Sequence, residues 1–165
     1  MFRRVIRVAA LATVLALVAA GVALADAGGQ GTVTITTHAN NVLLFSMPVT
    51  NPCTSAPGTL TAVAANEVFH VTFFTTGPEF WVTGTDEGTA TFTPADPHGA
   101  SYSGHFASWF GESSNNKNDV QHDIFNVNLA GSDGSHLVVN SVNHLTTNAL
   151  GVVTRTFSNF SFHCG

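Results

Sequence analysis

Apolar and polar residues alternate with a period of two along most of the chain beyond about residue 30. Such alternation is typical of β-strands with one buried face, and Val, Thr and Phe, which favour strands, dominate these segments. Short stretches such as "TTGPE", "TDEG" and "SDG" separate them and predict turns. The pattern predicts strands at about residues 31–37, 42–49, 59–64, 67–75, 80–85, 88–94, 101–110, 121–130, 135–147 and 152–163.

Many short strands joined by turns predict an all-β, antiparallel domain. The later strands follow one another as a meander, which favours closure into a barrel-like domain of about eight or more strands over the alternative, a β-sandwich. We expect a single domain at residues 31–165, with "GESSNNKND" (residues 111–119) as its longest polar loop.

The first 25 residues have a different pattern. Three arginines precede a long apolar run, and Ala23-Leu24-Ala25 has the small-x-small pattern of a cleavage site. These features predict a secretory signal peptide, helical, at residues 1–25, with cleavage after Ala25 and a flexible leader at residues 26–30. No later apolar stretch approaches the ~20 residues of a membrane helix. The expected product is secreted, extracellular and free of the membrane after signal removal.

Signal removal also changes the charge. Lys117 and Arg155 then remain against ten carboxylates, a net charge of 2 − 10 = −8. Nucleic acid and anionic lipid need clustered Lys and Arg to displace counterions, so we expect neither as a partner.

The two cysteines, Cys53 and Cys164, predict one disulfide, because an exported chain with two thiols most simply pairs them. The bond would close a loop of 111 residues. Loop entropy gives it an upper stabilisation on the order of 4 to 5 kcal/mol. It would hold the last strand near the first ones.

The turn at Asp133-Gly134 allows a register to be predicted. A two-residue type I′ turn makes residues whose numbers sum to 267 lie opposite each other, which pairs Asp123 with His144. A three-residue turn gives sums of 266 and places His122 opposite His144 instead.

The next turn, "NALG", extends this register to the last strand. A four-residue loop pairs residues whose numbers sum to 299, which places Arg155 beside His144 and Phe157 beside Val142. With Phe125 opposite Val142 in the first register, one face then carries an apolar row beside a polar row of Asp123, His144 and Arg155.

The polar row has three interpretations. Asp123 could orient the His144 imidazole as a general base, Arg155 could receive an anionic ligand, or the three groups could form a polar cap over the core. They are the catalytic candidates if the protein is an enzyme. The predicted ligand-binding residues are Phe125, Val142, His144, Arg155 and Phe157.

No metal or cofactor is predicted. His136 and His144 stand eight residues apart in one strand, about 26 Å, so they cannot share a metal. In the predicted register His136 faces His163, but a single pair is weak evidence for zinc. Trp81 and Trp109 are expected in core or rim packing rather than as ligand platforms.

The segments "NPCTSAPGTL", "NHLTTNALGVVT" and "FSNFSFHCG" carry a resemblance. They are similar to a loose group of short exported, functionally uncharacterised bacterial proteins with an N-P-C element, an H-x-T-x-N-x-x-G strand end and a terminal C-G. The similarity covers about residues 43–165. It implies the bridge from Cys53 to Cys164 and a motif role for His144 and Gly151.

Three classes of function follow. The favoured class is non-catalytic binding of a small apolar or weakly anionic ligand inside the barrel, because a small barrel can hold one ligand and phenylalanine is abundant. The second is a structural or surface-interaction protein with a filled barrel. The third is an acid-base enzyme, of isomerase or lyase type, that uses Asp123, His144 and Arg155.

Overall fold

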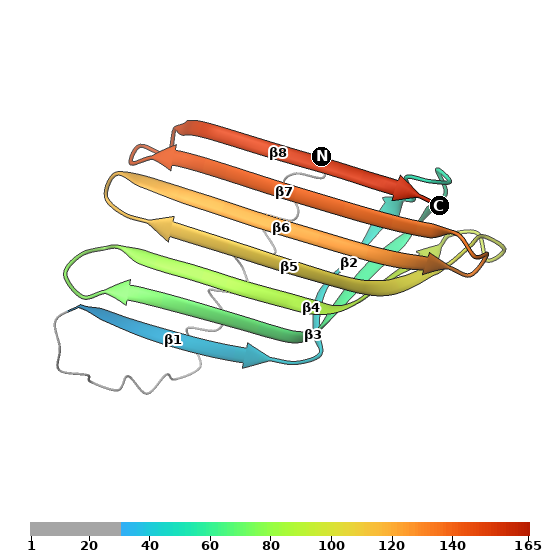
Figure 1. The fold of residues 1–165 in the computed structure, drawn as a ribbon, viewed down its shortest axis with the longest axis horizontal. Helices are drawn as coiled ribbons and strands as arrows, with labels where there is room; N and C mark the ends of the chain where they lie inside the picture. The colour runs from blue at the N-terminus through green and yellow to red at the C-terminus, as the bar shows by residue number, and fades with distance from the viewer. Residues whose placement is uncertain (1–30) are drawn as a thin grey trace. The chain divides into compact units, whose positions relative to one another are not determined.

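The computed structural model describes residues 31–165. The predicted signal peptide (1–25) and leader (26–30) lie outside the described residues. Within residues 31–165 no helix is long and apolar enough to cross a membrane. The strands are β1 (Thr32–Ala39), β2 (Val42–Thr50), β3 (Pro57–Phe74), β4 (Phe80–Pro94), β5 (Tyr102–Ser114), β6 (Asn118–Gly131), β7 (His136–Asn148) and β8 (Val153–Cys164) (Figure 1).

All eight strands belong to one antiparallel sheet, in the order β1-β3-β4-β5-β6-β7-β8, with β2 also paired to β3. β1 pairs with the second half of β3 and β2 with its first half. The two short strands thus lie end to end along one edge of β3, separated by Asn40 and by Asn41, whose φ is 57°. The predicted all-β antiparallel meander is confirmed.

One predicted turn and most of one predicted loop are strand instead. β3 and β4 each join two predicted strands, so "TDEG" lies inside β4. A bulge between Ala64 and Asn66 lets β3 continue past an irregular point of the ladder. The predicted 111–119 loop is also mostly strand, because only residues 115–117 separate β5 from β6.

The sheet is not closed, so the predicted barrel is not confirmed. β1 and β2 lie at one edge and β8 at the other, without pairing to each other. A disulfide nevertheless joins Cys53, just after β2, to Cys164 at the end of β8, with a Cα–Cα distance of 5.7 Å. This predicted bond is therefore present, and the sheet must fold over itself to allow it. Figure 1 shows β2 crossing behind the later strands toward the end of β8.

The hydrophobic core lies within this folded-over end. It contains Ala62, Ala64, Ala90, Phe92, Tyr102, Phe106, Val127, Leu129 and Leu137, from β3 to β7. Partly buried side chains from β2, including Val42, Phe45 and Val49, pack against it. Because opposed residues share a face, these side chains define one face of the sheet, the core face.

The other face carries polar side chains and is called here the threonine face. It is defined by Thr34, Thr72, Thr83, Thr85 and Thr91, which alternate with core-face residues along their strands. Seven of the eight histidines lie on it, at 38, 70, 105, 122, 136, 144 and 163. The alternation of Thr with apolar residues therefore corresponds to a sheet with one solvated face and one face that forms the core.

The predicted register between β6 and β7 is wrong by one residue. Gly131 N–H donates to the Ser135 carbonyl over 2.7 Å, which leaves a three-residue turn at 132–134. Only Gly134 has a positive φ, 85°, whereas a type I′ turn needs positive φ at both central residues. The pairs therefore sum to 266, as the alternative turn predicts, and His122 lies opposite His144.

The predicted register between β7 and β8 is wrong by two residues. The loop contains three residues, because Asn148 N–H donates to the Val152 carbonyl over 2.9 Å. A bulge between Thr146 and Thr147 adds the second shift, so that Phe157 lies opposite His144 and Arg155 opposite Thr146. A shift of two residues keeps every side chain on its predicted face.

Candidate functional site

The predicted row of Asp123, His144 and Arg155 does not form. Asp123 lies opposite Asn143 on the core face, while His144 lies opposite His122 on the threonine face. The one-residue shift moves the whole of β6 to the other face relative to β7, which separates carboxylate and imidazole. Arg155 shares the face of His144 but is opposite Thr146.

Asp123 instead belongs to a polar network on the core face. Its Oδ2 accepts a 2.7 Å hydrogen bond from Asn143 Nδ2, which also donates to Ser141 Oγ over 3.0 Å. Ser158 Oγ donates to Asn143 Oδ1 over 2.7 Å. Side chains from three strands satisfy one another here, which is a structural role.

The predicted ligand-binding residues are divided between the two faces. Phe125 is on the core face, where its ring lies 5.9 Å from that of Phe106. Val142, His144, Arg155 and Phe157 are on the threonine face, and Phe157 is 54% exposed. His144 Nε2 lies 3.1 Å from Thr146 Oγ1. Four of the five residues therefore share an accessible surface, without Phe125.

A second polar group on the core face contains two carboxyl groups. Glu67, which is 2% exposed, lies opposite Asp86, and Ser108 Oγ donates to Asp86 Oδ2 over 3.0 Å. Burial, and then the nearby Asp86 charge, raises the pKa of Glu67. Burial also raises the pKa of Asp86, against hydrogen bonds from Ser108 and Glu67 that lower it. The pair therefore favours holding a proton.

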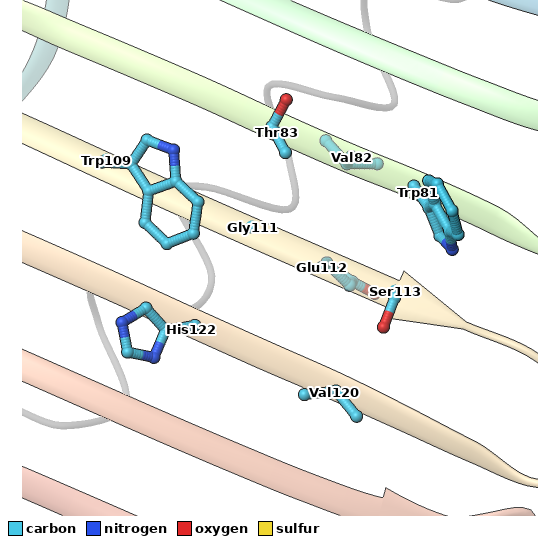
Figure 2. A pocket seen from close by; sticks show the side chains of 9 residues that line it. All are labelled: Trp81, Val82, Thr83, Trp109, Gly111, Glu112, Ser113, Val120 and His122. Atoms are coloured by element: carbon cyan, nitrogen blue, oxygen red, sulfur yellow. The ribbon is translucent and has the colours of Figure 1, made fainter.

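An open hollow of about 270 Å³ lies on the threonine face of β4, β5 and β6. Its lining residues are Trp81, Val82, Thr83, Trp109, Gly111, Glu112, Ser113, Val120 and His122. In Figure 2 the two indole rings stand on either side of Gly111, and the side chains of Val82 and Glu112 lie behind the sheet. Aromatic rings, hydroxyl groups and an imidazole thus surround one position without a side chain.

Gly111 creates this space. It lies between Thr83 and His122 in a row that continues through His144 to Phe157, each residue opposite the next. We call these five positions the central row. A Cβ at Gly111 would stand 3.0 Å from Cη2 of Trp109, so the indole leans over the glycine. A side chain here would displace the ring.

Aromatic contacts extend the hollow across the sheet. The ring centroids of Trp109 and His122 are 5.5 Å apart, and those of His122 and His144 are 5.9 Å apart. On the other side, Trp81 packs edge-on against Phe74 at 5.1 Å. Trp81 and Trp109 remain 56% and 38% exposed, so of the two expected locations, core or rim, the core does not apply to either. The hollow therefore adjoins the predicted residues His144 and Phe157.

The carboxyl group nearest the hollow is that of Glu112, on the core face of β5. Burial raises its pKa to about 7, and the neighbouring Asp119 charge adds to this effect. Because the side chain lies behind the sheet (Figure 2), it does not offer a charge to a ligand on the threonine face.

The sequence contained a signal for this hollow. Trp81 shares its side of the strand with Thr83 and Thr85, and Trp109 shares its side with Gly111 and Ser113, so both tryptophans belong to the polar set of their strands. A large aromatic residue on the polar side of a strand is expected to be an exposed ring rather than part of the core. Only the pairing of β4 with β5 shows that the two rings flank one glycine.

Residues 31–165 contain no group of three or more His, Cys, Asp or Glu side chains placed to hold a metal ion. No protein-family model, curated protein or solved structure matches the chain.

Proposed function

We propose that this is a secreted, non-catalytic binding protein whose ligand lies in the hollow between Trp81 and Trp109. The observation that supports this is the exposure of two indoles on either side of Gly111, 56% and 38% exposed, in a strand set that is otherwise polar. Exposed aromatic rings around a concave site are the usual anchors of a ligand with a flat apolar surface.

The residues of the hollow suit the ligand expected from the sequence, a small apolar or weakly anionic molecule. Indole rings suit the apolar part, while Thr83, Ser113 and His122 provide polar groups at its edge. The neighbouring His144, Phe157 and Arg155 extend the same surface, and Arg155 is the cation that an acidic group would meet. The proposed site is on the threonine face of the sheet rather than inside a barrel.

A non-catalytic role is supported by the position of the carboxylates. Asp123 lies on the core face, as does Glu112 behind the hollow. General acid-base catalysis needs a titratable group within hydrogen-bond reach of the reacting atom. His122 is the group of this kind among the lining residues, and it has a tryptophan rather than a carboxylate beside it.

The test uses 8-anilinonaphthalene-1-sulfonate, a small, weakly anionic aromatic probe. We expect saturable binding to the intact protein and a loss of about tenfold or more in affinity for Trp81→Ala and Trp109→Ala. Phe160→Ala is the matched control, because Phe160 is a 62% exposed aromatic residue on the core face of β8. Equal binding by all three variants would refute the proposal.

A further inference from the structure

We infer that the ligand of the hollow is a neutral carbohydrate chain, an inference that rests on the proposed function. A sugar ring has C–H groups on its face and hydroxyl groups around its edge. The C–H groups carry partial positive charge and pack on the negative face of an aromatic ring, while the hydroxyl groups need hydrogen-bond partners. The surface of the hollow is mostly apolar, and hydroxyl groups and an imidazole lie at its edge.

The lining groups have the required arrangement. Trp81 and Trp109 stand on either side, and Thr83, Ser113 and His122 lie around the Gly111 position (Figure 2). Each hydroxyl can donate one hydrogen bond and accept two, and the imidazole can donate and accept. A wholly apolar ligand would leave these groups unpaired and its own outer surface in water.

The charges favour a neutral chain. Among the lining residues the one with a carboxyl group, Glu112, lies behind the sheet (Figure 2), and Arg155 lies outside the lining, opposite Thr146. The chain beyond residue 25 has a net charge of 2 − 10 = −8, which repels polyanions such as acidic polysaccharides. A quaternary ammonium could pack on the indoles, but it has no hydrogen-bond donor or acceptor for the hydroxyl groups.

The central row gives the direction and the minimum length of the chain. From Gly111 the row continues through His122 and His144 to Phe157, across three strand spacings or about 14 Å. Consecutive rings along this line offer further faces for stacking, and Phe157 is 54% exposed at its end. We therefore expect more than one sugar unit to contact the protein.

The experiment titrates the protein, expressed from the full chain, with neutral oligosaccharides. The series are β-1,4-linked glucose, β-1,4-linked N-acetylglucosamine and α-1,4-linked glucose, from single sugars to hexamers, followed by calorimetry and tryptophan fluorescence. At least one series should bind, with affinity rising about tenfold or more from the single sugar to the longest oligomer. Choline is titrated in parallel as the cationic competitor.

Three variants locate the binding. Trp109→Ala should lower the affinity for every oligomer about tenfold or more, while His144→Ala should lower it only for the longer ones. Phe160→Ala should bind as the intact protein does. If Trp109→Ala does not fold, Gly111→Val, which fills the hollow and displaces the Trp109 ring without removing either tryptophan, should abolish oligosaccharide binding while circular dichroism stays unchanged.

The inference is overturned if no series binds or if choline binds more tightly than every sugar. It is also overturned if neither Trp109→Ala nor Gly111→Val changes the affinity for the oligosaccharides. The sulfonate probe separates this failure from that of the proposed function. If the probe still requires Trp81 and Trp109, the hollow remains a ligand site with a different ligand.

Discussion

Gly111 is the residue whose missing side chain makes the hollow, so it offers a direct test at the scale of one residue. Gly111→Val should fill the space and displace the Trp109 ring, whose Cη2 lies 3.0 Å from the Cβ position. We expect the affinity for the sulfonate probe to fall about tenfold or more, while the free energy of unfolding changes by less than about 1 kcal/mol, because valine suits a strand.

The control for this change is Thr89→Val, which introduces valine on the same face of β4, away from the hollow. It should leave probe binding unchanged. Full binding by Gly111→Val, measured by fluorescence titration, would show that the ligand lies elsewhere.

The raised pKa of Glu112 leads to a prediction of how stability depends on pH. Its folded pKa of about 7 lies above the ordinary value of 4.5, so between these values the folded protein holds a proton that the unfolded chain has released. Stability should therefore be greatest below this window and fall as the pH rises through it. The raised pKa values of Glu67 and Asp86 act in the same direction.

Between pH 5 and pH 8 the free energy of unfolding should fall less for the variant Glu112→Gln than for the intact protein. The difference should be about 1 kcal/mol, a value reduced because solvent screens a half-exposed group. Urea unfolding at the two pH values measures the difference. Glu79→Gln, at an exposed position, is the control. Identical pH dependence of the Glu112→Gln variant and the intact protein would contradict the assignment.

At the scale of the elements, two glycines lie where neighbouring strands approach each other closely. A Cβ at Gly104 would overlap the Asn128 carbonyl oxygen, and one at Gly88 would overlap the Val63 carbonyl oxygen. Neighbouring backbones therefore approach closely at the folded-over end of the sheet, and no side chain fits between them.

We predict that Gly104→Ala lowers the free energy of unfolding by about 3 kcal/mol, because backbone must move to admit the methyl group. Gly77→Ala is the control, since a Cβ at Gly77 meets nothing within 4 Å. Denaturant unfolding of both variants measures the effect. Equal stability of the two would mean that the strands do not approach as described.

The strands themselves could be predicted from the sequence, because alternation of Thr with Val, Ala and Phe is a local property. Their continuity could not, since the bulge near Ala65 and the pairing of Asp86 with Glu67 depend on partner strands. "TDEG" has the composition of a turn, but its aspartate is held inside a ladder.

The candidate site could be predicted only in part, because register depends on one turn residue. Asp133 has a negative φ and accepts a 3.0 Å hydrogen bond from Ser135 N–H, which stabilises the three-residue turn over the two-residue one. That single extra residue separates Asp123 from His144 and brings His122 beside it. The residues of the polar row were correctly placed on neighbouring strands, but not on one face.

At the scale of the whole described unit, the Cys53–Cys164 bond joins the two edges of an unclosed sheet across 111 residues. The double variant Cys53→Ser/Cys164→Ser should lose on the order of 4 kcal/mol of stability, because the unfolded chain regains the entropy of the open loop. Denaturant unfolding with and without reductant tests this. Reduction should lower the stability of the intact protein and leave that of the double variant unchanged.

Amide hydrogen exchange provides the structural readout. The exposed edge strand β8 should lose protection first on reduction, since the bond holds its end beside β2. β5, paired on both sides, should keep its protection longer. Uniform loss of protection would contradict a bond that acts at the edges.

The same bond determines how the molecule responds to tension. When residues 31 and 165 are pulled apart, force passes through the sulfur atoms, and the chain between Cys53 and Cys164 cannot be drawn out. The extensible length is then (53 − 31) + (165 − 164) = 23 residue steps, about 80 Å, against 134 steps or about 470 Å after reduction. An oxidised molecule stretched in an optical trap should therefore stop lengthening early, and β4 to β7, with the hollow, should stay shielded from the load.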